Sequence, residues 1–182
     1  MRPSLIAFIL AVNVCAIGPS RAQDNDPIAR AQGGVVECFS PNTLTRTCAG
    51  MSAYRILDDG KIASDQVVLI QNHPLVILSG TSIVYMRDGM VCDRVEQVDI
   101  DSARFTIDGA PAPADVAQSL RNALAASLSG IDELCARYTP EADGARVTVF
   151  ADGVERPDLS DHMIWVRRED GCTVGVADAS PT

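Results

Sequence analysis

Short runs rich in β-branched and aromatic residues, separated by Asp-Gly turns, fill the chain between residues 54 and 109 and resume after residue 146. Asp-Gly between such runs is the strongest short signal for a β-hairpin, because both central positions of the turn need a positive φ. We therefore predict antiparallel strands in these runs. The predicted strands are 54–57, 66–70, 75–78, 81–87, 90–92, 105–107, 147–150, 163–166 and 172–176.

One long helix is predicted between the two β-rich parts. Asp115 lies in its first turn, where a carboxylate complements free N–H groups, and Pro140 ends it. Gly130 falls inside the pattern and either kinks the helix or divides it. Apolar residues at spacings of three and four form one stripe along it: Val116, Leu120, Leu124, Leu128, Ile131, Cys135 and Tyr138. We expect the fold class to be α+β, an antiparallel sheet of β-hairpins packed on one long or kinked central helix through Leu120, Leu124, Leu128 and Ile131.

The two β-rich parts resemble each other. Residues 54–60 are similar in pattern to 147–153, and residues 83–89 are similar to 164–171 with one extra residue in the second copy. A cysteine follows the second Asp-Gly in each part. An internal duplication would explain this, but Asp-Gly hairpins are common enough to mimic a repeat, so both explanations stay open.

The first 22 residues follow the plan of a signal peptide. Arg2 supplies the positive charge, and the apolar run from residue 5 to residue 17 is broken only by Asn13. That run is too short to span a bilayer as a helix, which takes about 20 residues. Small residues at Ser20 and Ala22 predict cleavage after Ala22 and export to the periplasm or beyond the cell. The alternative is a membrane anchor that is never cut.

Cleavage would leave 160 of the 182 residues, which is the size of one domain. We expect a signal peptide at 1–22, a flexible leader at 23–34, a single disulfide-stabilised α+β domain at 35–177 and a frayed tail at 178–182. The first 22 residues contain two of the 15 basic residues and none of the 24 acidic residues, so the remaining chain has a net charge of −11. This acidity argues against nucleic acid and, after cleavage, against an anionic membrane as partners.

Five cysteines remain after cleavage, and an exported chain meets oxidants, so disulfides are expected. Five is odd, which predicts two bridges and one leftover thiol. Cys38 and Cys48 flank a stretch that begins with turn residues, and a bridge there would contribute about 2–3 kcal/mol. For the second bridge we favour Cys92 with Cys135, which would join a strand to the helix. Cys135 with Cys172 is the main rival; otherwise Cys172 is free or pairs between chains.

The front element of the chain, Cys38-x-x-Pro41-Asn42 followed by Thr47-Cys48, is the most specific part of a resemblance to small secreted proteins of Gram-negative bacteria. The likeness continues through Tyr54-Arg55, Asp88-Gly89 with Cys92, and Val166 with Asp170-Gly171, and so covers most of the exported chain. No activity, ligand or catalytic residue is assigned to that group, so the resemblance implies nothing about function. Cys172 departs from the group's pattern, which implies that it is the unpaired thiol.

No motif in the sequence assigns a catalytic residue, a metal ligand or a cofactor. Ser160-Asp161-His162 cannot form a triad by adjacency, because neighbouring strand residues point to opposite faces. His73 precedes Pro74 in a turn. The Asp-rich stretch from residue 99 lacks the ligand spacing of a calcium loop, and the cysteines lack zinc spacing. Arg167 and Arg168 would lower the pKa of the Cys172 thiol if they lay beside it.

These observations predict an exported, non-enzymatic binding or interaction protein whose partner is an unidentified protein or small molecule. Two alternatives remain. One is a periplasmic hydrolase that uses Asp and His, which a concave pocket containing His73 or His162 would favour. The other is an envelope accessory protein that forms mixed disulfides through Cys172, which an exposed thiol beside Arg167 or Arg168 would favour.

Overall fold

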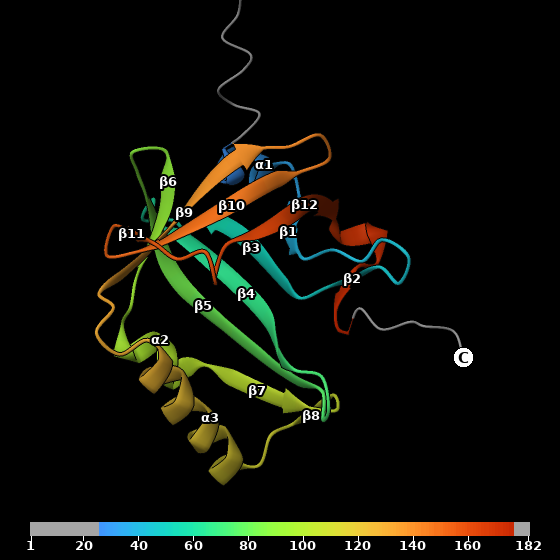
Figure 1. Cartoon of the computed structure of the whole chain (residues 1–182), viewed down its shortest axis with the longest axis vertical. Helices are drawn as coiled ribbons and strands as arrows, with labels where there is room; N and C mark the ends of the chain where they lie inside the picture. The colour runs from blue at the N-terminus through green and yellow to red at the C-terminus, as the bar shows by residue number, and fades with distance from the viewer. Residues whose placement is uncertain (1–25, 177–182) are drawn as a thin grey trace, which may run out of the picture.

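The computed structural model describes residues 26–176, and these form a mostly β fold built around a closed, eight-stranded antiparallel barrel (Figure 1). The barrel strands follow one another around the barrel in chain order, and the first strand closes it by pairing with the last. In order they are β1 (Val35–Phe39), β3 (Gly50–Ile56), β4 (Ile62–Gln71), β5 (Val76–Arg87), β6 (Met90–Arg94), β9 (Glu133–Pro140), β10 (Ala145–Ala151) and β12 (Asp161–Arg167). The predicted signal peptide and tail lie outside the described residues.

Three Asp-Gly turns shape hairpins as the sequence predicts, whereas at Asp59-Gly60 only the glycine has a positive φ. At residues 88–89, 108–109 and 152–153 both residues have positive φ, the conformation that a two-residue turn matched to strand twist requires. Asp170-Gly171 differs: Asp170 is the last residue of the short 3₁₀ helix η2 (Arg168–Asp170), and Gly171 caps it. The chain then enters β13 (Thr173–Val174), which pairs in parallel with β2 (Thr47–Cys48). The second part of the chain therefore does not repeat the double hairpin of the first, and the fold gives the duplication no support.

Helix α1 (Pro27–Gln32) covers one end of the barrel. Asp26 caps the helix by accepting hydrogen bonds from the amides of Ile28 and Ala29, and proline suits its first position. Ile28 is buried against Val84 and Val91. Within the predicted leader at 23–34, residues 27–32 therefore form a helix that an N-cap and one apolar anchor attach to the barrel.

A segment inserted between β6 and β9 lies below the barrel (Figure 1). It contains α2 (Gln97–Ser102), β7 (Arg104–Ile107), β8 (Ala110–Pro111) and α3 (Ala114–Ser127). Strand β5 is long enough to serve both parts: residues 84–87 pair with β6, and residues 76–79 pair with β7. The sheet therefore forks along β5, and α3 packs on the lower branch against Val76 and Phe105.

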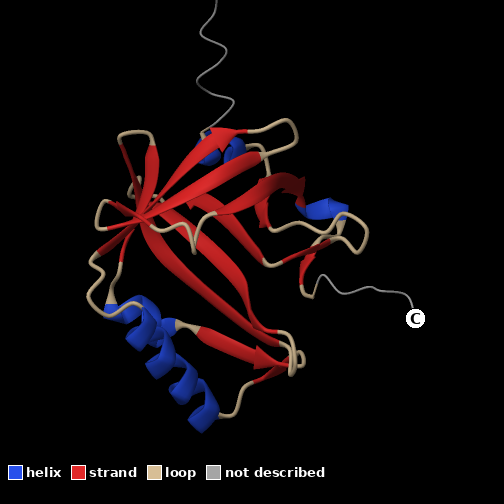
Figure 2. Ribbon diagram, viewed as in Figure 1, coloured by secondary structure: helices blue, strands red, loops and turns tan. Residues whose placement is uncertain are grey.

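The predicted fold class is wrong in its central feature. The helices are short and lie at the margins of the strands (Figure 2), and α3 ends at Ser127 instead of continuing to residue 139. Gly130 adopts a positive φ just beyond α3, and the chain then enters β9. Leu120 and Leu124 do pack on strands, but on the lower branch of the fork, and Ile131 lies beyond the helix. Among residues 26–176, no helix has the length and apolar character needed to cross a membrane.

A small outer layer covers β1 and β12. Strands β2 and β13 pair with each other, and the buried cluster behind them contains Val36, Cys38, Cys48 and Val166. The two-residue β11 (Val154–Glu155) extends β10 on another side. The outward side of β1 is therefore apolar and covered, which leaves the alternate residues of this strand to face the barrel interior.

Candidate functional site in the barrel lumen

The barrel encloses a cavity of about 390 Å³, which we call the lumen. It exists because successive strand residues alternate between the outer and inner faces, and several inward residues are small. Its walls are mainly apolar and come from all eight strands and the loops that join them. The side chains that face the lumen include Glu37, Phe39, Ser52, Tyr54, Ser64, Gln66, Val84, Val91, Asp93, Leu134, Ala136, Tyr138, Val147 and Val149.

Glu37 is the most deeply buried acidic group of the lumen, with 1% of its surface exposed. Its Oε2 accepts a hydrogen bond from the Tyr54 hydroxyl at 3.2 Å, and the hydroxyls of Tyr54 and Tyr138 lie 3.0 Å apart. A hydroxyl has one proton, so Tyr138 donates to Tyr54 in this chain. Oε1 of Glu37 has no hydrogen-bond partner among the described residues.

Burial dominates the electrostatics of this group. Burial raises the pKa of Glu37 to about 8, although the hydroxyls of Tyr138, Tyr54 and Ser52 act to lower it. Burial also raises the pKa values of Tyr54 and Tyr138 well above their usual range, with Glu37 adding to the rise. Both tyrosines therefore stay protonated and serve as donors at physiological pH.

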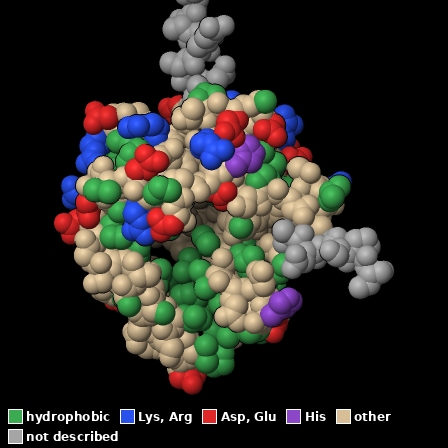
Figure 3. Space-filling model, in the orientation of Figure 1, with side chains coloured by type: hydrophobic (Ala, Val, Ile, Leu, Met, Phe, Trp, Pro, Cys, Tyr) green, Lys and Arg blue, Asp and Glu red, His purple; other side chains and the backbone are tan. Residues whose placement is uncertain are grey.

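A second hollow of about 260 Å³ lies at the fork between β6 and β7, beneath α2 and α3. It shares four lining residues with the lumen, Gln66, Val68, Asp93 and Leu134, so the two spaces adjoin at these residues. The register explains its position, because residues 80–83 of β5 pair with β4 but with neither β6 nor β7. The face of the molecule in Figure 3 is hollowed below the barrel, and hydrophobic side chains gather in that hollow.

Asp93 stands where the two spaces meet. Its Oδ2 accepts a hydrogen bond from the Ser82 hydroxyl at 2.6 Å, and its buried Oδ1 has no partner among the described residues. Burial raises the pKa of Asp93 to about 6; Ser82 opposes this rise, and the nearby Asp99 and Glu96 add to it. At neutral pH this carboxyl is therefore ionised and only half satisfied.

The residues that line the lumen carry charge of one sign. Glu37, Asp93 and Asp161 are acidic, and no lysine, arginine or histidine is among the lining residues that the structure describes. Asp161 differs from the other two because both of its carboxylate oxygens accept hydrogen bonds, Oδ2 from the Ser40 hydroxyl at 2.5 Å and Oδ1 from the His162 amide at 2.7 Å. Comparisons with family models, curated proteins and solved structures give no match. A function can therefore be inferred only from the geometry and charge of the lumen.

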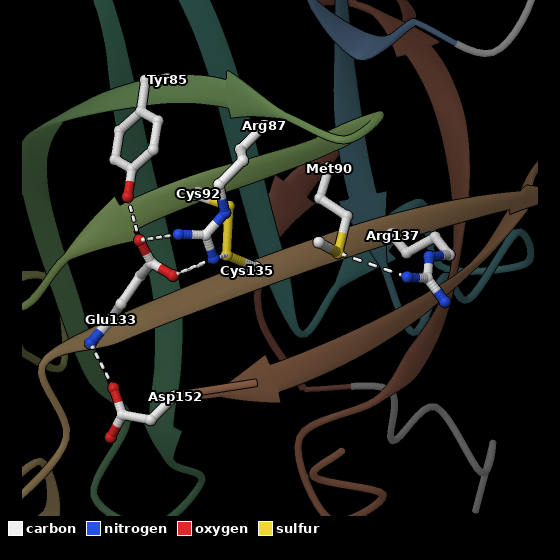
Figure 4. The surroundings of a disulfide bond; sticks show 8 residues. All are labelled: Tyr85, Arg87, Met90, Cys92, Glu133, Cys135, Arg137 and Asp152. Carbon is white, nitrogen blue, oxygen red and sulfur yellow. Dashed lines mark hydrogen bonds and ion pairs between the residues drawn. A yellow bond between two sulfur atoms is a disulfide. The ribbon is translucent and has the colours of Figure 1, made fainter. Parts of the chain in front are cut away.

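The Cys92–Cys135 disulfide lies on the opposite, outer face of the barrel wall. The two cysteines face each other across β6 and β9, and Figure 4 shows Tyr85, Arg87 and Glu133 beside them. Tyr85 and Arg87 both donate hydrogen bonds to the Glu133 carboxylate. The pair is the one that the sequence analysis favours, but the bridge joins strand to strand and not strand to helix. Both sulfurs are bonded to each other, so they offer no thiolate to a metal beside Glu133.

The other cysteines lie under the outer layer. Cys38 and Cys48 form the second disulfide, which is the favoured local pair. Cys172 has no disulfide partner among residues 26–176 and packs, half-buried, against the same apolar cluster. It lines a hollow of about 460 Å³ together with Cys38 and Asp170. Arg167, which the sequence analysis considered beside this thiol, is exposed and forms an ion pair with Glu169 at 3.8 Å.

The histidines and the Ser160-Asp161-His162 run do not converge on a site. His162 binds Glu141 through Nδ1 at 2.7 Å, Ser160 accepts a hydrogen bond from the Val149 amide, and Asp161 lines the lumen. His73 lies in the turn before a cis Pro74. Neither histidine lines the lumen or the second hollow.

Sequence reasoning missed every polar group of the lumen. One signal was available: Glu37 interrupts the run Val35-Val36-Glu37-Cys38-Phe39, where a charge in an apolar strand marks a buried polar site. The helical spacing of apolar residues predicts Tyr138 on a helix, although Leu134, Ala136 and Tyr138 also alternate as strand residues do. Asp93 gave no comparable signal, because its burial depends on α2 and on the distant β4.

Proposed function

We propose that the protein is an exported, non-enzymatic binding protein that holds one small molecule in the lumen of its barrel. The observation that carries this proposal is an apolar cavity of about 390 Å³ lined by two carboxyl groups, Glu37 and Asp93, each with one oxygen that has no partner in the described part of the chain. Eight-stranded barrels have interiors of a size to hold one small ligand. Pockets for small molecules usually measure about 300–1,000 Å³ and combine apolar walls with a few polar groups.

The unsatisfied oxygens favour a ligand over an empty core. A buried polar atom without a partner costs about 1–3 kcal/mol, and native interiors contain few of them. Glu37 and Asp93 both line the lumen, so a single ligand with suitable hydrogen-bonding groups could satisfy both carboxyls. The disulfides Cys38–Cys48 and Cys92–Cys135 support the exported location, since such bridges persist in oxidising compartments. Nothing observed favours the hydrolase alternative, because the histidines lie away from the lumen.

The test uses N-phenyl-1-naphthylamine, a neutral apolar probe whose fluorescence rises in apolar surroundings. We expect saturable binding of one probe per chain. Two variants that fill the lumen, Ala136→Phe on β9 and Val149→Phe directly across from it on β10, should each abolish binding. Thr139→Phe is the matched control, because it adds the same ring to the exposed face of β9.

Circular dichroism and thermal melts would show which variants fold, and only folded variants are compared. Two independent filling positions guard against the loss of either one to misfolding. If the wild-type protein gives no saturable binding, or if both folded filling variants bind as well as Thr139→Phe, the lumen is not a binding site.

A further inference from the structure

The lumen and the second hollow together present an electrostatic pattern that narrows the ligand class. Asp93 stands at their junction with one carboxylate oxygen bound to Ser82 and the other unpartnered. Glu37 lies deeper, 1% exposed, with its own unpartnered oxygen. Acceptors without donors call for a ligand that donates, and a half-satisfied carboxylate in an apolar setting calls for a positive charge.

We propose that the ligand is an amphipathic amine whose ammonium group binds Asp93 and whose apolar part fills the lumen and the second hollow. This inference rests on the proposed function and specifies its ligand class. The apolar part would contact Val68 and Leu134 at the junction and Leu124 and Leu128 of the α3 segment in the second hollow. An alkyl or aryl amine supplies both the ammonium group and the apolar part.

Asp93 and not Glu37 is assigned to the ammonium group. Asp93 borders both spaces, so a cation there leaves room for apolar substituents on either side. At neutral pH Asp93 is ionised, whereas burial keeps Glu37 mostly protonated, with a pKa of about 8. A protonated Glu37 can donate as well as accept, so it suits a neutral polar group further along the ligand.

The groups around Asp93 reinforce its negative potential. Ser82 faces it from β5 and Gln66 from β4, while Glu96 and Asp99 approach from α2 and its start. Tyr54 of β3 lies close enough for Asp93 to raise its pKa. Arg94 is the one basic residue among those that line the second hollow, and its guanidinium lies 5.9 Å from the ring centre of Tyr85.

A metal ion fits this junction less well than an amine. Within residues 26–176, the one place where three Cys, His, Asp or Glu ligand atoms gather within metal-binding distance is Cys92, Glu133 and Cys135 on the outer face. Asp93, Glu96 and Asp99 do not form such a group. The surrounding leucines and valines also suit a hydrocarbon body and not a hydrated cation.

The experiment measures displacement of N-phenyl-1-naphthylamine by decylamine, decanol and sodium decanoate at pH 7.5. These share one chain and differ in head-group charge. We expect decylamine to bind about ten- to a hundred-fold more tightly than decanol, as a charge-assisted hydrogen bond implies, and decanoate to bind weakest. Asp93→Asn should remove the amine preference and leave decanol affinity within about twofold. The control Asp58→Asn makes the same charge change in an exposed turn and should keep the preference.

A second measurement needs no variant. In wild-type protein, decylamine affinity should fall by about tenfold per pH unit below pH 6 as Asp93 becomes protonated, while decanol affinity stays level. Equal binding of decylamine and decanol, a preference for decanoate, or an amine preference that survives in folded Asp93→Asn would overturn the amine proposal and leave lumen binding intact. Failure of the naphthylamine probe itself to bind would sink the proposed function and this inference together.

Discussion

One carboxyl–tyrosine grouping lies inside the barrel and another on its outer face, and they differ in how completely the carboxylate is hydrogen-bonded. On the outer face, Glu133 accepts hydrogen bonds from Tyr85 and Arg87 (Figure 4). In the lumen, Glu37 accepts one from Tyr54 and has an unpartnered oxygen. The Tyr85 hydroxyl, followed by Arg87, lowers the pKa of Glu133, whereas burial raises that of Glu37.

This difference separates a structural role from a binding role. The outer grouping is complete within the protein and stands beside the Cys92–Cys135 bridge, so it serves to hold β5, β6 and β9 together. In the inner grouping, no lysine or arginine is among the described lining residues and Oε1 of Glu37 has no hydrogen-bond partner, so a ligand that hydrogen-bonds there would offset the cost of this unsatisfied oxygen. The predictions below test whether the outer grouping governs stability and the inner grouping governs proton and ligand binding.

Removal of the outer bridge should have the largest effect on stability. The double substitution Cys92→Ser with Cys135→Ser opens a loop that spans 43 residues and should lower the free energy of unfolding by about 4 kcal/mol in the chain-entropy model. Urea denaturation would measure it, with Cys172→Ser as a control that removes a sulfur but no bridge. If the folded double variant also loses probe binding in the lumen, the outer grouping affects binding as well as stability, and the two faces do not have separate roles.

The pH dependence of stability should show that Glu37 keeps its proton in the folded state. Its pKa is about 8 when folded and 4.5 when exposed, so folding favours the protonated carboxyl. The resulting stabilisation is complete below pH 4.5 and is lost as the pH rises through 8. Between pH 7 and 8, where Asp93 is mostly ionised, the free energy of unfolding should fall by up to about 1.4 kcal/mol per pH unit.

Glu37→Gln cannot ionise and should flatten this slope in denaturant titrations at several pH values. Glu155→Gln is the matched control, because it makes the same change on the exposed β11. A slope that is identical in wild type, Glu37→Gln and Glu155→Gln would mean that Glu37 does not hold its proton in the folded state.

The hairpins could be predicted from the sequence because their information is local. Asp88-Gly89 and Asp152-Gly153 specify tight turns with positive φ, whatever the rest of the chain does. Closure of the barrel could not be predicted in the same way. It depends on the pairing of β1 with β12, for which no local residue pattern encodes a partner more than 120 residues away. A hairpin sheet and a closed barrel share the same alternation along each strand.

The long-helix error shows where two periodicities coincide. Leu128, Ile131, Cys135 and Tyr138 continue the helical spacing of α3, yet Leu134, Ala136 and Tyr138 alternate as a strand. Gly130 decides between them because its positive φ lies outside the helix. The candidate site was hidden by the same ambiguity, since an inward Tyr138 exists only once β9 is recognised as a strand that faces Glu37.

The smallest predicted effect compares the two tyrosines directly. Tyr54→Phe and Tyr85→Phe each remove one hydroxyl that donates to a glutamate, and Tyr54→Phe, whose glutamate is buried, should lower the free energy of unfolding by about 1 kcal/mol. Each should also raise the pKa of its own glutamate, because each hydroxyl lowers that pKa now. Carbon-detected NMR titration of the labelled carboxyl groups would follow both. Ligand binding distinguishes the two variants. Tyr54 lines the lumen, so Tyr54→Phe should alter decylamine affinity, whereas Tyr85→Phe should not. Equal effects of the two substitutions on affinity would show that the inner and outer groupings do not have separate roles.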